Sequence, residues 1–471
     1  DAGMLATPRT RRDILKLMAI GGSLVLLPAA LAGCSDDNGI TIPVTPQPNT
    51  GSPLTIDFAK GDIAVLQFAY ALEQLEADFY TRVVNSFASS NLTAADKAVL
   101  QDIKYHEVLH REFLKAALGA TNGFTVTPTY PGVNFNDRSS VLTTAKTFED
   151  LGVAAYNGAA QYLTSAANLT LAGKIVSVEA RHASAISDLL SPKTSAFSPT
   201  AFDDVFRPSK GGPGLRRRQA RLRQCAQHVR AGPEHQRLRN DMIIEQRPIL
   251  ESIDPEILDT LAAREDEITQ GASMSSSTAA LLALGSIPIA LGALAKDVYG
   301  QAPSDVLDVL QFALLLEYLE AEFYQRGLAA SGLIDAADRT IFTTISGHET
   351  IHVAALQALI TQKGAAPIAK PTFDFTAKGN VAGFNFSAGQ YETFKILSMA
   401  FEDTGVRAFK GQAPRLINDK AALNAALSIH SVEARHAAEV RRLRNKKAWI
   451  TGSSRDDLPA FTQGIYAGED N

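Results

Sequence analysis

The stretch LQDIKYHEVLHREFLKAAL, residues 100–118, carries a glutamate and a histidine three positions apart inside an apolar helical pattern. Residues i and i+3 of a helix lie on one face, so Glu107 and His110 point at the same place. LAGKIVSVEARHASAISDLL, residues 171–190, repeats this arrangement with Glu179 and His182. A carboxylate on the inner face of a helix bundle is costly without a counter-charge. The two stretches therefore predict helices that share a metal site.

Two further glutamates, Glu73 and Glu149, each precede one of these pairs in the sequence. The resulting order Glu, ExxH, Glu, ExxH is the ligand set of a carboxylate-bridged dinuclear site inside a four-helix bundle. The whole order occurs a second time in the other half of the chain. The predicted metal ligands are thus Glu73, Glu107, His110, Glu149, Glu179 and His182 in the first copy, and Glu317, Glu349, His352, Glu402, Glu433 and His436 in the second.

This ligand set also indicates the class of ion that would bind and the small molecules that would react there. Carboxylates can bridge two hard or borderline ions, and one neutral imidazole on each ion leaves coordination positions open. We therefore expect two iron or manganese ions per domain, with oxygen or peroxide as the small-molecule substrate. Carboxylate and imidazole ligands do not discriminate between iron and manganese.

Three tyrosines recur at one spacing from the single glutamates. Tyr80, Tyr156 and Tyr324 each lie seven residues after Glu73, Glu149 and Glu317, respectively. Seven residues is nearly two helical turns, so each phenol returns to the face of its glutamate. There it could hydrogen-bond a ligand carboxylate or take part in redox chemistry, which makes these tyrosines candidate catalytic residues. A core aromatic is the alternative interpretation, and Phe409 breaks the pattern after Glu402.

Several paired motifs carry a resemblance to a known family. These are ALEQLEADFY and LLEYLEAEFY, HEVLH and HETIH, FEDLGVAAY and FEDTGVRAF, and SVEARHA in both copies. They resemble the ferritin-like domain family, including desiccation-related proteins, and share the rubrerythrin and ferritin pattern of Glu followed seven residues later by Tyr. The resemblance covers roughly residues 58–190 and 302–447. It implies two ferritin-like bundles with di-iron or di-manganese sites, and it implies much less about the reaction.

The sequences HEVLH and HETIH also match H-E-x-x-H, the helix of zinc hydrolases. That chemistry needs a third metal ligand downstream, and neither copy supplies one at the usual spacing. It would also leave Glu73, Glu149, Glu179 and His182 without a role. We keep a zinc hydrolase as a remote alternative, in which His106 and His348 would be ligands.

The apolar periodicity predicts an all-α fold of two four-helix bundles, each with a long crossover between its second and third helices. Thr93 to Asp96 reads as a capped helix start, and Gly119 or Gly123 as a stop. Any strands should be short and lie in the crossovers. The expected helices span residues 61–88, 94–119, 139–166 and 170–190, then 304–330, 335–362, 388–411 and 418–447.

The N-terminus predicts export. Residues 10–16, TRRDILK, resemble a twin-arginine motif, and an apolar run then ends in LAGC at Cys34, which resembles a lipobox. We expect a periplasmic or envelope protein held at the membrane by a lipid on Cys34, or by an uncleaved anchor. With one other cysteine in the chain, a disulfide framework is not supported.

The middle of the chain is anomalous. Residues 207–241 are rich in arginine, and residues 277–295 resemble a second signal segment or a membrane helix. A frameshift or readthrough that joined two genes would explain both. The expected segments are a signal at 1–34, a flexible tether at 35–57, domain 1 at 58–206, the Arg-rich linker at 207–241, a second linker at 242–301, domain 2 at 302–447 and a tail at 448–471.

Composition adds limits to function. The 471 residues carry a net charge of only −5, which does not favour nucleic acid as a partner. Homo-oligomers are compatible with the sequence. We expect redox chemistry in oxidative or desiccation stress, namely Fe(II) oxidation or peroxide removal. The alternative is a bundle that binds metal without catalysis or protects the envelope.

Overall fold

The computed structural model describes residues 39–42, 54–205, 306–376, 379–381 and 383–467. The predicted signal at 1–34, the Arg-rich linker at 207–241 and the signal-like segment at 277–295 lie outside these residues. Among the helices of the described ranges, none has the length and apolar character needed to cross a membrane.

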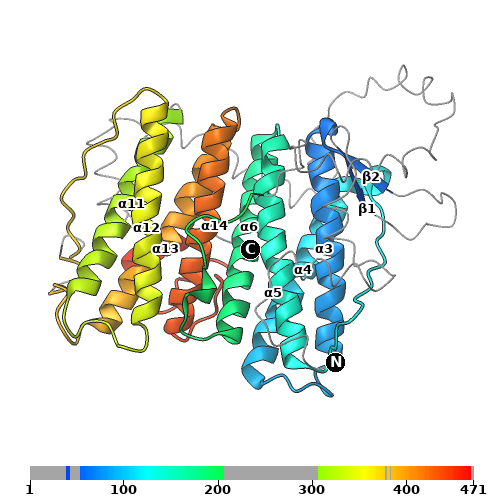
Figure 1. Ribbon diagram of the computed structural model, residues 1–471, viewed down its shortest axis with the longest axis horizontal. Coiled ribbons are helices and arrows are strands. Elements are labelled where there is room, and N and C mark those ends of the chain that lie inside the picture. The colour runs from blue at the N-terminus through cyan, green and yellow to red at the C-terminus, as the bar shows by residue number, and fades with distance from the viewer. Residues whose placement is uncertain (1–38, 43–53, 206–305, 377–378, 382, 468–471) are drawn as a thin grey trace, which may run out of the picture. The chain divides into compact units, whose positions relative to one another are not determined.

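Eight long helices carry the ligand motifs, four in each copy (Figure 1). Those of the first copy are α3 (Asp62–Asn85), α4 (Ala94–Asn122), α5 (Arg138–Ala159) and α6 (Ala166–Leu190). Those of the second copy are α11 (Val306–Ala329), α12 (Arg339–Gln362), α13 (Tyr391–Gln412) and α14 (Lys420–Leu443). Short helical turns occur at Phe58–Lys60, Ala160–Tyr162, Ser195–Phe197, Ala413–Leu416 and Ala460–Thr462, and α15 spans Gln463–Tyr466.

The described residues fall into two compact units. The first contains α3, residues 100–122 of α4 and the crossover to residue 136. The second contains residues 92–99, α5, α6 and the whole second copy. In this second unit, α11 packs on α12 and α13 on α14, while α11 also contacts α13 and α12 contacts α14. These contacts close a four-helix bundle, and a long crossover joins α12 to α13 as predicted.

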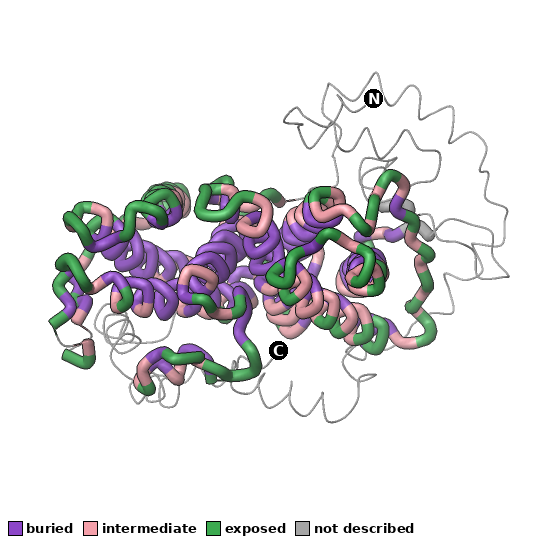
Figure 2. Tube along the Cα trace, turned by 90° about the horizontal axis from the view of Figure 1, so that it is seen from below, coloured by how far each residue is buried: buried purple, intermediate pink, exposed green. Residues whose placement is uncertain are grey.

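Helix α14 is buried all round along much of its length (Figure 2). Every residue from 426 to 441 is buried. A helix that is buried on all sides has neighbours on all sides. Besides the helices of its own bundle, α14 packs along α6 of the first copy. The last helices of the two copies therefore lie side by side.

Local sequence explains where the helices begin and end. Thr93 and Asp96 cap α4 as predicted, because the Thr93 hydroxyl accepts a bond from the Asp96 amide at 3.1 Å. Gly119, with φ of 61°, interrupts α4 near the predicted stop. The prediction that one helix runs over 139–166 is wrong at its end. Ser165 accepts a bond from the Asn168 amide and starts α6, so α5 ends at Ala159.

The predicted position of the strands is also wrong. Within the described residues, the strands are β1 (Gly39–Ile42) and β2 (Leu54–Asp57), which pair antiparallel before α3. They lie inside the segment 35–57 that we predicted as a flexible tether. The described parts of the crossovers contain no strand. Prolines such as Pro128, Pro131 and Pro371 lack the N–H that a strand ladder requires, which accounts for this.

Candidate metal centres

In the second copy, the six predicted ligands converge from all four helices of the bundle. Nδ1 of His352, on α12, lies 3.2 Å from Oε2 of Glu317 on α11 and 3.2 Å from Oε1 of Glu433 on α14. It also lies 3.1 Å from Oε2 of Glu349, one turn earlier on its own helix. One imidazole nitrogen thus faces carboxylates from three helices.

The second histidine of this copy makes the matching set of contacts. Nδ1 of His436, on α14, lies 2.8 Å from Oε1 of Glu349 and 3.3 Å from Oε2 of Glu402 on α13. Glu349 therefore uses one oxygen toward each histidine. All six side chains are fully buried.

The ligand atoms form two groups of four with shared members. In the first group, the atoms of Glu317, Glu349, His352 and Glu433 lie within 4.8 Å of one another. In the second, those of Glu349, Glu402, Glu433 and His436 do the same. Glu349 and Glu433 belong to both groups. The glutamates of the two ExxH motifs therefore contribute to two candidate metal positions.

The electrostatics of the cluster fit a bound cation. Glu317 Oε1 and Glu433 Oε2 are buried without a hydrogen-bond donor, a state that is costly unless a cation lies beside them. Burial raises the pKa of Glu402 to about 8 and the pKa of Glu317 well above its ordinary value. Burial also opposes charge on Glu349, but His352 and His436 offset it and hold that pKa well below the usual range. Divalent ions would supply the missing positive charge.

Both histidines are oriented by hydrogen bonds on their far nitrogens. Nε2 of His352 donates to the carbonyl oxygen of Ala201 at 2.6 Å. Nε2 of His436 lies 3.0 Å from Nδ1 of His348. Burial and the neighbouring His436 lower the pKa of His348 to about 3, so His348 is neutral at physiological pH. Both histidines therefore turn Nδ1 toward the glutamates, the arrangement in which a bond on the far nitrogen orients a histidine ligand.

His348 thus supports a ligand instead of joining the cluster. In a zinc hydrolase, His348 and His352 would bind one ion together. Among the described residues, the ligand groups of the second copy contain His352 and His436 but not His348. The pair of histidines that the zinc alternative requires is therefore not brought together in one ligand group of the described residues.

Tyr324 contacts the ligand set as the seven-residue spacing suggests, although its acceptor lies on a different helix. Its hydroxyl donates to Oε1 of Glu402 on α13, and the tyrosine is fully buried. Phe409, at the position equivalent to Tyr156, is buried in an apolar pocket with Leu316 and Leu356. In the first copy, Tyr80 and Tyr156 are likewise buried.

Glu320 is a site residue that sequence reasoning missed. It is 3% exposed, and its Oε2 has no hydrogen-bond partner. Burial and Glu433 raise its pKa well above the ordinary value. It meets the ligands beside Gly405, where a Cβ would lie 2.8 Å from Oε2 of Glu433 and 3.3 Å from Oε1 of Glu320. The signal was a second glutamate three residues after the first, which recurs as the buried Glu76 in the first copy.

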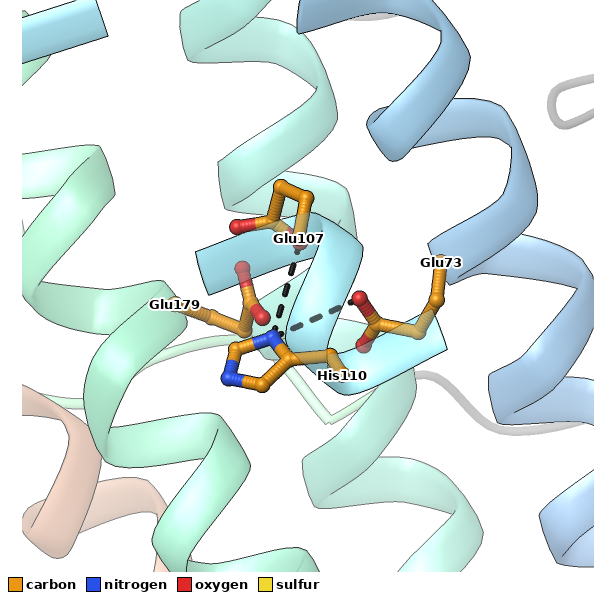
Figure 3. A group of neighbouring side chains, drawn as sticks. All are labelled: Glu73, Glu107, His110 and Glu179. Atoms are coloured by element: carbon orange, nitrogen blue, oxygen red, sulfur yellow. Dashed lines mark ion pairs between the residues drawn. The ribbon is translucent and has the colours of Figure 1, made fainter. Parts of the chain in front are cut away.

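The first copy shows the same local pairings within each compact unit. In the first unit, Nδ1 of His110 lies 3.4 Å from Glu73 and 3.5 Å from Glu107 (Figure 3). In the second unit, Nδ1 of His182 lies 3.2 Å from Glu149 and 3.6 Å from Glu179. Each histidine thus faces one glutamate of its own ExxH motif and one from the neighbouring helix. This matches the way His352 faces Glu349 and Glu317.

Fold and site together define a metal-binding protein built from four-helix bundles. A family model for the ferritin-like domain matches residues 61–192 and 305–446, one match for each copy. The chain therefore belongs to the ferritin-like domain family and contains the domain twice, as the sequence motifs predicted. The curated proteins and the solved structures give no match to this chain.

Proposed function

We propose that each domain binds two iron or manganese ions, which react with oxygen or peroxide. The observation that supports this most directly is the pair of four-ligand groups that share Glu349 and Glu433. A mononuclear site would need only one such group. The repeat of all six ligand types in the first copy extends the proposal to that domain.

The six ligands of the second copy would have different roles in binding the ions. Glu317 and His352 would hold one ion and Glu402 and His436 the other, and Glu349 and Glu433 would contribute to both positions. The ions would supply electron transfer to oxygen or peroxide. Tyr324 holds one oxygen of Glu402 through its hydroxyl proton. The complete burial of the ligands excludes bulk water and strengthens every charge interaction in the site.

The same burial favours a second candidate function, metal binding without catalysis. Ions that bind only the folded chain stabilise it by mass action, and a stable bundle could protect the envelope in drying. For either function we propose an exported protein, held at the membrane through Cys34. The LAGC sequence that ends at this cysteine supports the location.

Metal analysis and kinetics test these proposals in one series. We expect about four iron or manganese ions per full chain, two in each domain. The Glu349→Ala variant should lose the pair in the second domain, and Glu107→Ala the pair in the first. Glu392→Ala, at an ion-paired glutamate whose side chain is 77% exposed, is the control and should keep all of them.

Peroxide consumption and Fe(II) oxidation then separate the two functions. The chain with both Glu107→Ala and Glu349→Ala should lose turnover if the ions are catalytic. Full metal content in the unmodified chain with no turnover would favour the non-catalytic function. Unchanged turnover in the double variant would exclude the redox proposal, and one zinc ion per domain would favour the hydrolase.

A further inference from the structure

The segment that follows the last helix of each copy crosses to the other copy. Both segments leave their helix through a residue with positive φ, Lys193 at 59° and Asn445 at 56°. An aromatic residue follows four positions later in each case, Phe197 after Lys193 and Trp449 after Asn445. Both aromatic side chains are buried. All of these residues lie in the second unit.

The segment of the first copy, residues 195–203, covers the histidines of the second. The Phe197 ring lies 6.2 Å from the ring of His436, and the Phe202 ring lies 5.5 Å from that of His352. Between them, the Ala201 carbonyl accepts the 2.6 Å bond from Nε2 of His352. A residue outside the second domain thus selects the nitrogen that His352 presents to its glutamates.

The segment of the second copy makes the reciprocal contact. The Trp449 ring stands edge-on to the ring of His182, with 5.5 Å between centroids. The neighbouring carbonyl of Ala448 accepts a bond from Nη1 of Arg181 at 3.2 Å. Each copy therefore contributes an aromatic side chain to a ligand histidine of the other.

Paired charges beside the ligands hold this exchange in place. Arg181 pairs with Asp403 at 2.8 Å, and Arg435 pairs with Asp150 at 3.0 Å. Each arginine directly precedes a ligand histidine and each aspartate directly follows a ligand glutamate, so the two pairs join equivalent positions in opposite directions. Arg435 also binds Asp203 at 2.8 Å, which anchors the end of the first segment. Asp203 lies two residues after Ala201, so this ion pair helps to hold the segment beside His352.

We propose that residues 195–203, which follow the last helix of the first domain, form part of the second domain's metal centre. The Ala201 carbonyl positions His352, and Phe197 and Phe202 keep water away from both histidines. Such hydrogen bonds to ligand histidines typically affect metal affinity about 10- to 100-fold. Trp449 covers His182 of the first domain in the same way. The inference rests on the proposed metal function. It adds that each domain's metal centre includes residues contributed by the other domain.

Manganese release from the full chain tests the exchange. Mn(II) alone is loaded, and its transfer to an excess of chelator is timed. The Glu107→Ala background confines metal to the second domain, and the Glu349→Ala background confines it to the first. In the Glu107→Ala background, Phe202→Ala should speed release about tenfold, whereas Trp449→Ala should leave it unchanged. In the Glu349→Ala background, Trp449→Ala should speed release about tenfold, whereas Phe202→Ala should leave it unchanged.

Controls separate covering from general destabilisation. Phe202→Leu keeps an apolar side chain over His352 and should recover most of the slow release. If Phe202→Ala acted only by destabilising the fold, this recovery would not be expected. Phe202 is only partly buried, so Phe202→Ala should fold. The test uses Phe202 because alanine at the fully buried Phe197 could prevent folding. Equal effects of Phe202→Ala and Trp449→Ala in both backgrounds, or no effect of either, would overturn the inference. Failure of the parent chain to bind Mn(II) would instead contradict the proposed function itself.

Discussion

The two copies keep the same ligand residues but differ in the residues that support them. Asp403, beside Glu402, is fully buried and contacts Arg181, Arg441 at 3.1 Å and the Tyr466 hydroxyl at 2.8 Å. Its counterpart Asp150, beside Glu149, keeps a 17% exposed side chain and pairs with Arg435 and Lys146. The comparison shows that the ligand set is repeated strictly, whereas the charges around it have diverged.

The largest difference between the copies should appear when these aspartates are neutralised. Asp403→Asn leaves the buried Arg181 and Arg441 without their shared carboxylate, although Asp456 still pairs with Arg441. Removal of one partner from a buried ion pair typically costs about 3–5 kcal/mol. Asp150→Asn should cost only about 1 kcal/mol, because Arg435 keeps Asp203 and the site reaches solvent. Denaturant unfolding of both variants gives the comparison.

Equal losses in the two variants would mean that burial does not distinguish the two pairs. A control is Asp457→Asn, because this aspartate pairs with Arg444 and Lys446 through a side chain that is 55% exposed. Its stability should change by less than about 1 kcal/mol.

A second difference between the copies is a buried carboxyl on α14. Glu439, three residues after His436, is 1% exposed, and the first copy has Ala185 at this position. Burial, followed by the charge of Asp188, raises the Glu439 pKa from 4.5 to about 8. The folded chain therefore holds a proton that the unfolded chain has released between these values. Stability should fall as pH rises from 4.5 to 8, through this group alone.

The Glu439→Gln variant, which has no charge to bury, tests this dependence. At pH 8 it should be more stable than the parent by roughly 2–4 kcal/mol, and near pH 4.5 the gain should vanish. Urea unfolding across this pH range measures the difference. An equal gain in unfolding free energy at pH 4.5 and at pH 8 would show that the packing of Glu439, and not its ionisation, destabilises the parent chain.

Sequence could predict the ligands because helical spacing determines which residues share a face. Glu349 and His352 meet at one point for that reason alone, and the fold class followed from finding the set twice. The end of α5 was missed because the Ser165 cap competes with a continuous apolar pattern. Glu320 was missed because a second glutamate on a helix resembles a solvated face until its burial is known. No local pattern could reveal that Ala201 binds His352, since 151 positions separate them.

The smallest expected difference concerns the tyrosine that holds Glu402. Tyr324→Phe removes the hydroxyl that donates to Glu402, at a cost of about 1–2 kcal/mol. Because Glu402 then loses one of the contacts that orient it, Mn(II) affinity of the second domain should fall about tenfold. The control is Tyr391→Phe, which breaks a buried 2.8 Å bond to Asp338 in the same bundle, away from the ligands.

The two variants should lose similar stability, but only Tyr324→Phe should weaken Mn(II) binding, measured by titration in the Glu107→Ala background. Loss of affinity in both would mean that any weakening of this bundle also weakens metal binding.

Phe409→Tyr sharpens the comparison of the two copies, because it gives the second copy the tyrosine that the first has at Tyr156. Phe409 lies in an apolar pocket and its new hydroxyl would need a partner there. A stable Phe409→Tyr chain would therefore indicate that the added hydroxyl finds a hydrogen-bond partner, and Gln412 lines the same pocket.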